Sequence, residues 1–220
     1  MIKINNDFSR PSDSLFTHLF ARSISVHITP IIAKTSITPM QVTIASLIFG
    51  LFAAWVGSNH SWLCGLSAAF LIELSHILDC IDGELARLTG RGNPFAANID
   101  PISDRVKDMA VIFAACLQSL QLKIFHLMEF EIFSIAFFTI SCWFLYLYIV
   151  DAFLNPAKIK KADKESVGKT RIYLGLYDLF IYGSIMFWIF NIFEYFIFYI
   201  LIISIAGIPI QLIKLKANLK

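Results

Sequence analysis

The sequence predicts an all-α integral membrane protein with six transmembrane helices and an N-terminal amphipathic surface helix. Of its 220 residues, 57% are hydrophobic and only 15% are charged, and the mean hydropathy is +0.70. A soluble domain needs a more polar surface than this composition supplies. A membrane-spanning helix needs about 20 mostly apolar residues, and six such stretches fit the chain. They lie at about 39–57, 62–79, 100–120, 132–154, 172–190 and 193–213.

The N-terminal residues predict a cytoplasmic segment that contains a helix lying on the membrane surface. Residues 15–34 mix apolar positions with Arg22 and His27, a pattern that suits a helix in the membrane interface. The segment lacks the continuous apolar core of a cleavable secretory signal. The chain is therefore expected to consist of an N-terminal segment, 1–37, and a transmembrane domain, 38–220.

Local signals mark where the first spans begin and end. Thr38 precedes Pro39, and Gln41 follows three residues after Thr38. This arrangement predicts a capped start for the first span. The polar residues 58–61 predict a tight turn into the second span. Residues 90–94, with two glycines and a proline, predict a break between the second and third spans.

The basic residues predict the orientation of the protein in the membrane, because Lys and Arg concentrate in cytoplasmic loops. Fifteen of the 18 Lys and Arg residues fall on one side, which holds both termini and the loops after the second and fourth spans. The other side receives only Lys123, while Arg105 and Lys107 lie in the first turns of the third span. Both termini and these two loops are thus predicted to be cytoplasmic.

Acidic residues gather at the predicted cytoplasmic ends of the second and third spans. Residues three or four apart share a face of a helix, which gives two stripes. The first stripe contains Asp79, Asp82, Gly83 and Ala86, and the second contains Asp100, Asp104 and Asp108. Carboxylates at membrane depth are costly unless they pair, face a wet cavity or bind an ion. Ligands of this kind favour Mg²⁺ or Mn²⁺ over zinc, and two such ions about 3.5–4 Å apart can clamp a phosphoryl group. The sequence therefore predicts a metal site for phosphoryl transfer.

The residues around these acids suit a nucleotide. Gly83 and Ala86 would let a nucleotide or a partner helix approach the backbone closely, and Arg87 is placed to hold a phosphate. The alternative is a structural network of ion pairs at the helix ends, formed with Arg87 and Arg105. Two basic residues cannot neutralise four closely set aspartates without leaving buried charge, so the metal site is the favoured interpretation.

This stretch resembles the signature of the CDP-alcohol phosphotransferase family, D-x2-D-G-x2-A-R-x8-G-x3-D-x3-D. Every spacing is kept over 26 residues, and the one departure is Ala96, where the family has glycine. The matching residues are Asp79, Asp82, Gly83, Ala86, Arg87, Asp100 and Asp104. A signature of this length is specific, so chance is a poor explanation for the match.

The resemblance implies a role for each of these residues. The implied metal ligands are Asp79, Asp82, Asp100 and Asp104, and Asp104 would also be the general base that deprotonates the acceptor hydroxyl. The implied CDP contacts are Thr43, Asp79, Asp82, Gly83, Ala86 and Arg87. The candidate acceptor contacts are Arg105, Lys169 and Arg171. For Lys169 and Arg171, simple cytoplasmic anchoring is an equally good interpretation.

The resemblance also implies an enzyme of phospholipid biosynthesis that moves a phosphatidyl or phospho-alcohol group from a CDP-linked donor to an alcohol and releases CMP. CDP-diacylglycerol is the expected donor, and a polyol or polyol phosphate is the expected acceptor. Two Mg²⁺ or Mn²⁺ ions, membrane lipid and a homodimer are expected, and no nucleic acid. A soluble CDP-polyol donor is the alternative within the same chemistry. A cation transporter is the alternative from another class, although a transporter would spread its acids across the bilayer depth.

Overall fold

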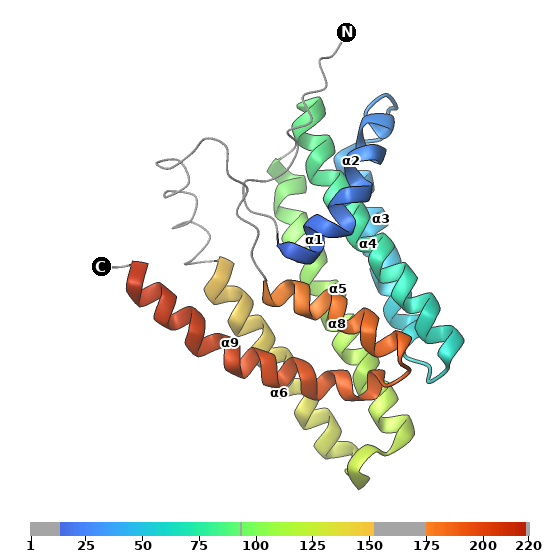
Figure 1. Cartoon of the computed structure of the whole chain (residues 1–220), viewed down its shortest axis with the longest axis vertical. Coiled ribbons are helices and arrows are strands. Elements are labelled where there is room, and N and C mark those ends of the chain that lie inside the picture. The colour runs from blue at the N-terminus through green and yellow to red at the C-terminus, as the bar shows by residue number, and fades with distance from the viewer. Residues whose placement is uncertain (1–13, 93, 152–174, 219–220) are drawn as a thin grey trace.

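The computed structural model of the chain describes residues 14–92, 94–151 and 175–218, and its regular elements there are all helices (Figure 1). In chain order they are α1 (Leu15–Leu19), α2 (Ala21–Ile32), α3 (Pro39–Gly57), α4 (Trp62–Thr89), α5 (Pro94–Leu122), η1 (Ile124–His126), α6 (Glu129–Ile149), α8 (Leu176–Ile189), η3 (Phe193–Tyr195) and α9 (Phe196–Asn218). The all-α prediction is confirmed for this part of the chain.

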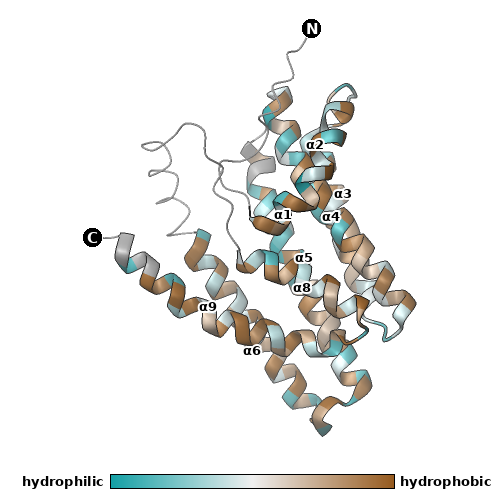
Figure 2. Cartoon of the chain, viewed as in Figure 1, coloured by the Kyte–Doolittle hydropathy of each residue, from teal (hydrophilic) through white to brown (hydrophobic). Residues whose placement is uncertain are grey.

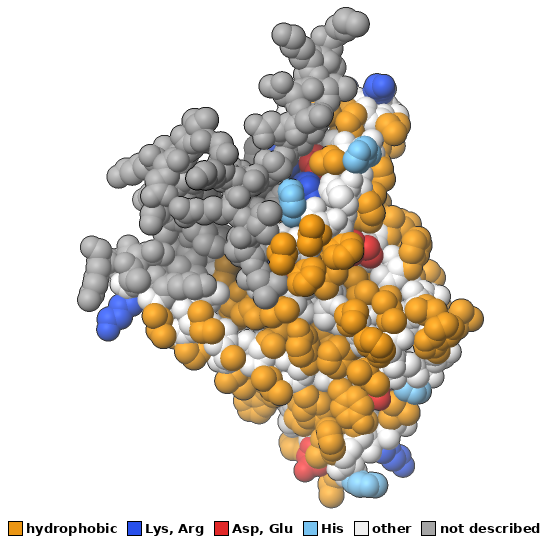
Figure 3. Space-filling model, viewed as in Figure 1, with side chains coloured by type: hydrophobic (Ala, Val, Ile, Leu, Met, Phe, Trp, Pro, Cys, Tyr) orange, Lys and Arg blue, Asp and Glu red, His pale blue; other side chains and the backbone are white. Residues whose placement is uncertain are grey.

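Four helical segments are long and apolar enough to cross a membrane: α3, α4, α6 and the segment Phe193–Ile213 of η3 and α9. Helix α8 is apolar but has only 14 residues. Hydrophobic residues dominate the ribbons of α6 and α9 (Figure 2), and Figure 3 shows a nearly continuous hydrophobic surface across the middle of the visible face. A soluble monomer rarely exposes an apolar surface of this extent. The chain is therefore a multi-pass integral membrane protein.

The first span begins where the sequence predicts. The Thr38 hydroxyl accepts a hydrogen bond from the backbone N–H of Gln41 at 3.3 Å, and Gln41 Oε1 accepts one from the N–H of Thr38 at 2.9 Å. Pro39 occupies the first turn of the helix. This reciprocal capping box satisfies two N–H groups at the start of the helix, so it fixes the point at which α3 enters the bundle.

Helices α4 and α5 extend further toward their connection than hydropathy predicts. Helix α4 continues past Asp79 to Thr89 and ends at Gly90, whose φ of +64° suits glycine. Helix α5 begins at Pro94, a position that tolerates proline because the first N–H groups of a helix have no partner within it. The acidic residues of the signature therefore all lie inside helices.

Helices α3 and α4 pair as a hairpin at one side of the molecule (Figure 1). Helix α5 packs against α3 and α6, while α2 and α8 pack against α4, and α6 runs beside α9. Two serines join α3 to α4: Ser46 Oγ donates to the Ser75 carbonyl at 2.9 Å, and Ser75 Oγ donates to the Ser46 carbonyl at 2.8 Å. Small polar residues allow membrane helices to approach closely and to hydrogen bond, so these serines fix the pairing of the two helices.

The N-terminal segment forms two helices, whereas the sequence predicts a single one over residues 15–34. Helices α1 and α2 are separated at Phe20, and α2 packs against α4. Arg22 is predicted to lie on the surface helix of the cytoplasmic N-terminal segment, but in the structure it is buried. The physical reason is a buried carboxylate on the neighbouring helix α4.

That carboxylate belongs to Glu84, whose side chain is 0% exposed. Arg22 Nη1 lies 2.7 Å from Glu84 Oε1. Ser25 Oγ donates to Glu84 Oε1 at 2.8 Å, and Thr29 Oγ1 donates to Glu84 Oε2 at 2.5 Å. A buried charge is tolerated when it is paired and hydrogen bonded in this way. Glu84 therefore fastens α2 to the helix that carries the first two signature aspartates.

Replacing Glu84 with alanine is expected to destabilise the protein by about 3–5 kcal/mol, because it removes the acceptor shared by a buried cation and two buried hydroxyls. Thermal unfolding of the purified protein in detergent measures the effect as a lowered melting temperature. Glu129→Ala is the matched control, since Glu129 is exposed, and a change within about 0.5 kcal/mol is expected there. Equal melting temperatures for the two variants would contradict the structural role of Glu84.

Candidate active site

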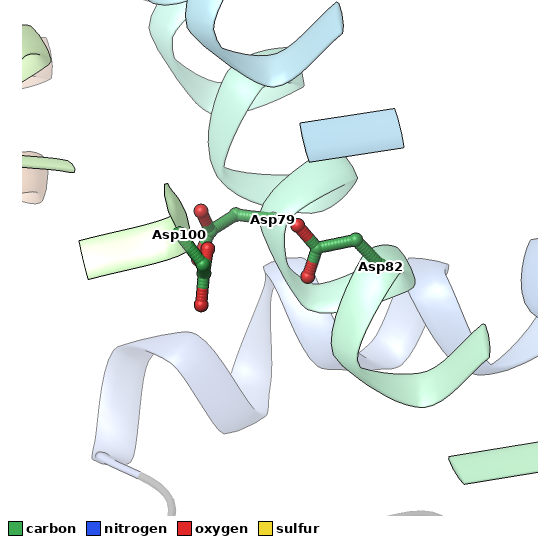
Figure 4. A group of neighbouring side chains, drawn as sticks. All are labelled: Asp79, Asp82 and Asp100. Atoms are coloured by element: carbon green, nitrogen blue, oxygen red, sulfur yellow. The ribbon is translucent and has the colours of Figure 1, made fainter. Parts of the chain in front are cut away.

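Three of the predicted metal ligands meet between α4 and α5. Asp79 and Asp82 project from α4 and Asp100 from α5, and their carboxylates point toward one another (Figure 4). Each side chain offers one oxygen, and these oxygens all lie within 4.8 Å of one another. Asp82 is buried, and the other two are partly buried. Carboxylate oxygens in this arrangement suit a hard divalent cation such as Mg²⁺ or Mn²⁺.

A hydroxyl on α3 orients one of these carboxylates. Thr43 Oγ1 donates to Asp82 Oδ2 at 2.5 Å, and Thr43 is buried. Thr43 lies one turn beyond the capped start of α3, so the cap also fixes the position of this hydroxyl. Thr43 is predicted to contact CDP, and in the structure its hydroxyl donates to a predicted metal ligand.

The fourth predicted ligand, Asp104, lies one turn further along α5 and forms an ion pair with Lys107. Lys107 Nζ lies 2.8 Å from Asp104 Oδ1 and 3.1 Å from Asp79 Oδ1. Nζ also donates to Ser46 Oγ at 3.0 Å. Lys107 is only 6% exposed. One buried ammonium therefore joins α3, α4 and α5 at the edge of the carboxylate cluster.

This role of Lys107 is not among the predictions from the sequence, where the residue is only a charge near the cytoplasmic side. Two signals in the sequence point to the role. Lys107 follows Asp104 by three residues, so the two side chains share a face of the helix. A lysine within a membrane-spanning stretch also needs a partner, because an uncompensated charge there is costly.

Arg105 pairs with a different set of carboxylates. Its guanidinium lies 2.6 Å from Asp151 Oδ2 and 3.5 Å from Asp108 Oδ2. Asp108 also accepts a hydrogen bond from Trp143 Nε1 at 2.9 Å, and Trp143 is fully buried. Asp108 shares the predicted stripe of Asp100 and Asp104, but these contacts direct it to α6. Arg105 and Asp108 therefore join α5 to α6 beside the carboxylate cluster.

The remaining predicted site residues lie on α4, at the start of α5 or outside the described residues. Gly83 and Ala86 are partly buried on α4, and Arg87 is exposed on the same helix. Ala96, the departure from the signature, falls within the first turn of α5, but the described structure does not include its side chain. Lys169 and Arg171 lie outside the described residues, so their predicted acceptor contacts stay predictions.

A small cavity opens beside Lys107, between α4, α5 and α8. Five polar residues line it: Ser75, His76, Lys107, Asp108 and Tyr177. Its apolar walls are Ile72, Val111, Phe180 and Ile181. The site thus has polar surroundings on the inner side of the bundle as well as at the carboxylates.

Comparison with known proteins relates most of the chain to one family. Residues 36–208 match the family model described as CDP-alcohol phosphatidyltransferase. The bifunctional IPC transferase and DIPP synthase of Aquifex aeolicus is 30% identical over 105 residues, which are 48% of this chain and 23% of the relative. The archaetidylinositol phosphate synthase of Pyrococcus horikoshii is 30% identical over 89 residues, 40% of this chain and 46% of the relative.

A further relative, the phosphatidylinositol phosphate synthase of Corynebacterium glutamicum, is 34% identical over 96 residues, which are 43% of this chain and 42% of the relative. The chain spans less than half the length of each of these three curated relatives. The family match, in contrast, includes every described residue of the carboxylate cluster and its partners on α3, α4 and α5.

Proposed function

Because the chain belongs to the CDP-alcohol phosphatidyltransferase family, we propose that it is a metal-dependent membrane enzyme of phospholipid biosynthesis. It would move a phosphatidyl or phospho-alcohol group from a CDP-linked donor to an alcohol and release CMP. The observation that supports this function most is the approach of three carboxylate oxygens, from Asp79, Asp82 and Asp100, to within 4.8 Å of one another. That donor set fits a divalent ion, which this chemistry needs to hold a diphosphate.

Each residue of the cluster has a role in the proposed reaction. Asp79, Asp82 and Asp100 would hold Mg²⁺ or Mn²⁺, and the bound ion supplies positive charge against the donor diphosphate and the departing CMP. Thr43 keeps Asp82 turned toward the other two carboxylates through its hydrogen bond. Asp104, beside the cluster, would also contact the metal site and accept the proton of the acceptor hydroxyl as general base.

The CDP group of the donor would lie along α4. Gly83 and Ala86 follow Asp79 on the same helix, and the missing side chain of Gly83 and the single methyl group of Ala86 would let a nucleotide approach the backbone closely. Arg87 would pair with a phosphate oxygen. Asp79, Asp82 and Thr43 would border the same nucleotide from the metal side.

The acceptor class that we propose is a polyol phosphate. Two relatives are named archaetidylinositol phosphate synthase and phosphatidylinositol phosphate synthase, which supports an acceptor of this class. A phosphorylated acceptor would need cations to bind its phosphate, and Arg105, Lys169 and Arg171 are the proposed residues. CDP-diacylglycerol is the proposed donor, and a soluble CDP-polyol is the alternative.

The proposed membrane arrangement has six spans, with α5 and α8 added to the four long apolar segments. Both termini and the carboxylate cluster would face the cytoplasm, as the distribution of the basic residues supports. Helices α1 and α2 both lie within the N-terminal segment 1–37, which precedes the proposed transmembrane domain 38–220, and they would lie at the membrane surface. A homodimer is the proposed assembly.

Release of CMP by protein purified in detergent tests the proposed function. CDP-diacylglycerol and a soluble CDP-polyol are supplied in turn, in Mg²⁺ or Mn²⁺, with inositol, inositol phosphate or glycerol phosphate as the acceptor. We expect CMP from CDP-diacylglycerol with a polyol phosphate, and only when both are present. CMP release from the soluble CDP-polyol, but not from CDP-diacylglycerol, would favour the alternative donor. If no pairing releases CMP, the chain is not this enzyme, and cation flux in vesicles then tests the transporter hypothesis.

A further inference from the structure

The position of Lys107 bears on how many metal ions the site holds. This inference rests on the proposed metal-dependent function. Two divalent ions are expected among the four aspartates of the signature. We propose that the ammonium of Lys107 is a permanent cation of this site and takes the place of the second ion. A single divalent ion would then bind where Asp79, Asp82 and Asp100 meet.

Oxygen atoms from three side chains surround the ammonium of Lys107. Lys107 Nζ donates hydrogen bonds to Ser46 Oγ at 3.0 Å and to Asp79 Oδ1 at 3.1 Å, and it forms an ion pair with Asp104 Oδ1 at 2.8 Å. The Lys107 side chain is 7% exposed. A buried cation that is paired and hydrogen bonded in this manner is costly to displace.

The aliphatic part of Lys107 also has a fitted path. A Cβ atom added at Gly50 would lie 2.7 Å from Lys107 Cδ and 2.8 Å from Lys107 Cγ. The lysine stem therefore runs through the space that this glycine leaves on α3. Gly50 lies one turn beyond Ser46, so α3 supplies both room for the stem and an acceptor for the ammonium. This packing restricts the Lys107 side chain to one conformation and keeps its ammonium at the carboxylates.

The ammonium lies where a second ion would need to bind. A divalent ion shared by Asp79 and Asp104 would have to lie about 2.0–2.1 Å from oxygens of both carboxylates. Lys107 Nζ is already within 3.1 Å of an oxygen on each of them, and two cations so close repel each other. The four aspartates carry four negative charges, which one lysine and one divalent ion reduce to a single net negative charge.

The number of bound Mn²⁺ ions tests this role. The full chain is purified in detergent and titrated with Mn²⁺ alone, and electron paramagnetic resonance measures free and bound metal. Wild-type protein is expected to bind one equivalent. Lys107→Met, which keeps the length of the side chain without its charge, is expected to bind two. Two ions about 3.5–4 Å apart would also show magnetic coupling that a single ion cannot show.

Three further variants control this measurement. Lys107→Arg keeps the charge and is expected to bind one equivalent. Lys123→Met makes the same substitution beyond the other end of α5, where Lys123 is exposed, and is expected to bind one. Lys107→Gln gives the same expectation as Lys107→Met if the methionine variant does not fold, and gel filtration monitors folding.

Two outcomes would overturn the role of Lys107: two equivalents of Mn²⁺ in the wild-type protein, or a single equivalent of unchanged affinity in the neutral variants. The wild-type titration decides the first point even if no variant folds. Absence of Mn²⁺ binding in the folded wild-type protein would instead contradict the proposed metal-dependent function. The two failures are therefore distinguishable.

Discussion

Asp104→Asn is expected to lower the rate of CMP release by about 10²–10⁴-fold, the usual contribution of a general base. Asparagine retains an oxygen that can accept from Lys107, but it cannot take a proton from the acceptor hydroxyl. The Asp79, Asp82 and Asp100 oxygens approach one another without Asp104, so the variant is expected to fold and to retain most of its Mn²⁺ binding. The measurements are CMP release under saturating substrates and Mn²⁺ titration.

The control for this variant is Asp108→Asn, the same substitution one turn further along α5. Asp108 contacts Trp143 and Arg105, so its loss is expected to affect packing more than chemistry and to reduce turnover by less than about 10-fold. Turnover of Asp104→Asn at the wild-type rate would remove Asp104 from the proposed reaction as its base.

Asp79→Asn is expected to remove both metal binding and turnover. Asp79 contributes an oxygen to the cluster and also contacts Lys107, so one substitution disturbs both cations of the site. Loss of about 10³-fold in CMP release would correspond to about 4 kcal/mol of transition-state stabilisation, which is within what a bound ion supplies. CMP release and Mn²⁺ affinity are measured on the same preparation.

Chelation provides the control for Asp79→Asn. Wild-type protein treated with EDTA is expected to lose activity and to regain it when Mn²⁺ is restored, whereas the variant is expected to stay inactive at the same free Mn²⁺ concentration. Recovery of the variant to the wild-type rate at that concentration would show that Asp79 is not needed to hold the ion.

Local features of the fold could be predicted from the sequence, and the ends of the charged helices could not. The start of α3 depends on residues within four positions of Thr38, so the capping pattern predicts it. Hydropathy ends the second span at about residue 79, because the acids begin there, but the helix continues until Gly90 permits a left-handed turn. Apolar length therefore predicts the part of a helix that lipid can cover, and the helix itself can extend beyond that part.

At the site, the placement of residues close in the sequence could be predicted, and the partners far apart in the sequence could not. Helical spacing places Asp79 and Asp82 on one face, and the short connection to α5 allows Asp100 to approach them. The partners of the basic residues depend on contacts far apart in the chain: Arg22 and Glu84 are 62 residues apart, and Lys107 and Ser46 are 61 apart. Periodicity indicates which face of a helix is buried, but it does not indicate which distant helix covers that face.

The paired serines of α3 and α4 also bear on how a lipid-linked donor reaches the carboxylates. An acyl chain that enters sideways from the bilayer has to pass between two helices. Parting α3 from α4 would break both hydrogen bonds between Ser46 and Ser75, which are buried, and leaving buried polar groups without their partners is costly. The lipid-linked donor is therefore expected to enter from the bilayer between another pair of helices. Helices α3 and α4 are expected to move as one rigid body during turnover.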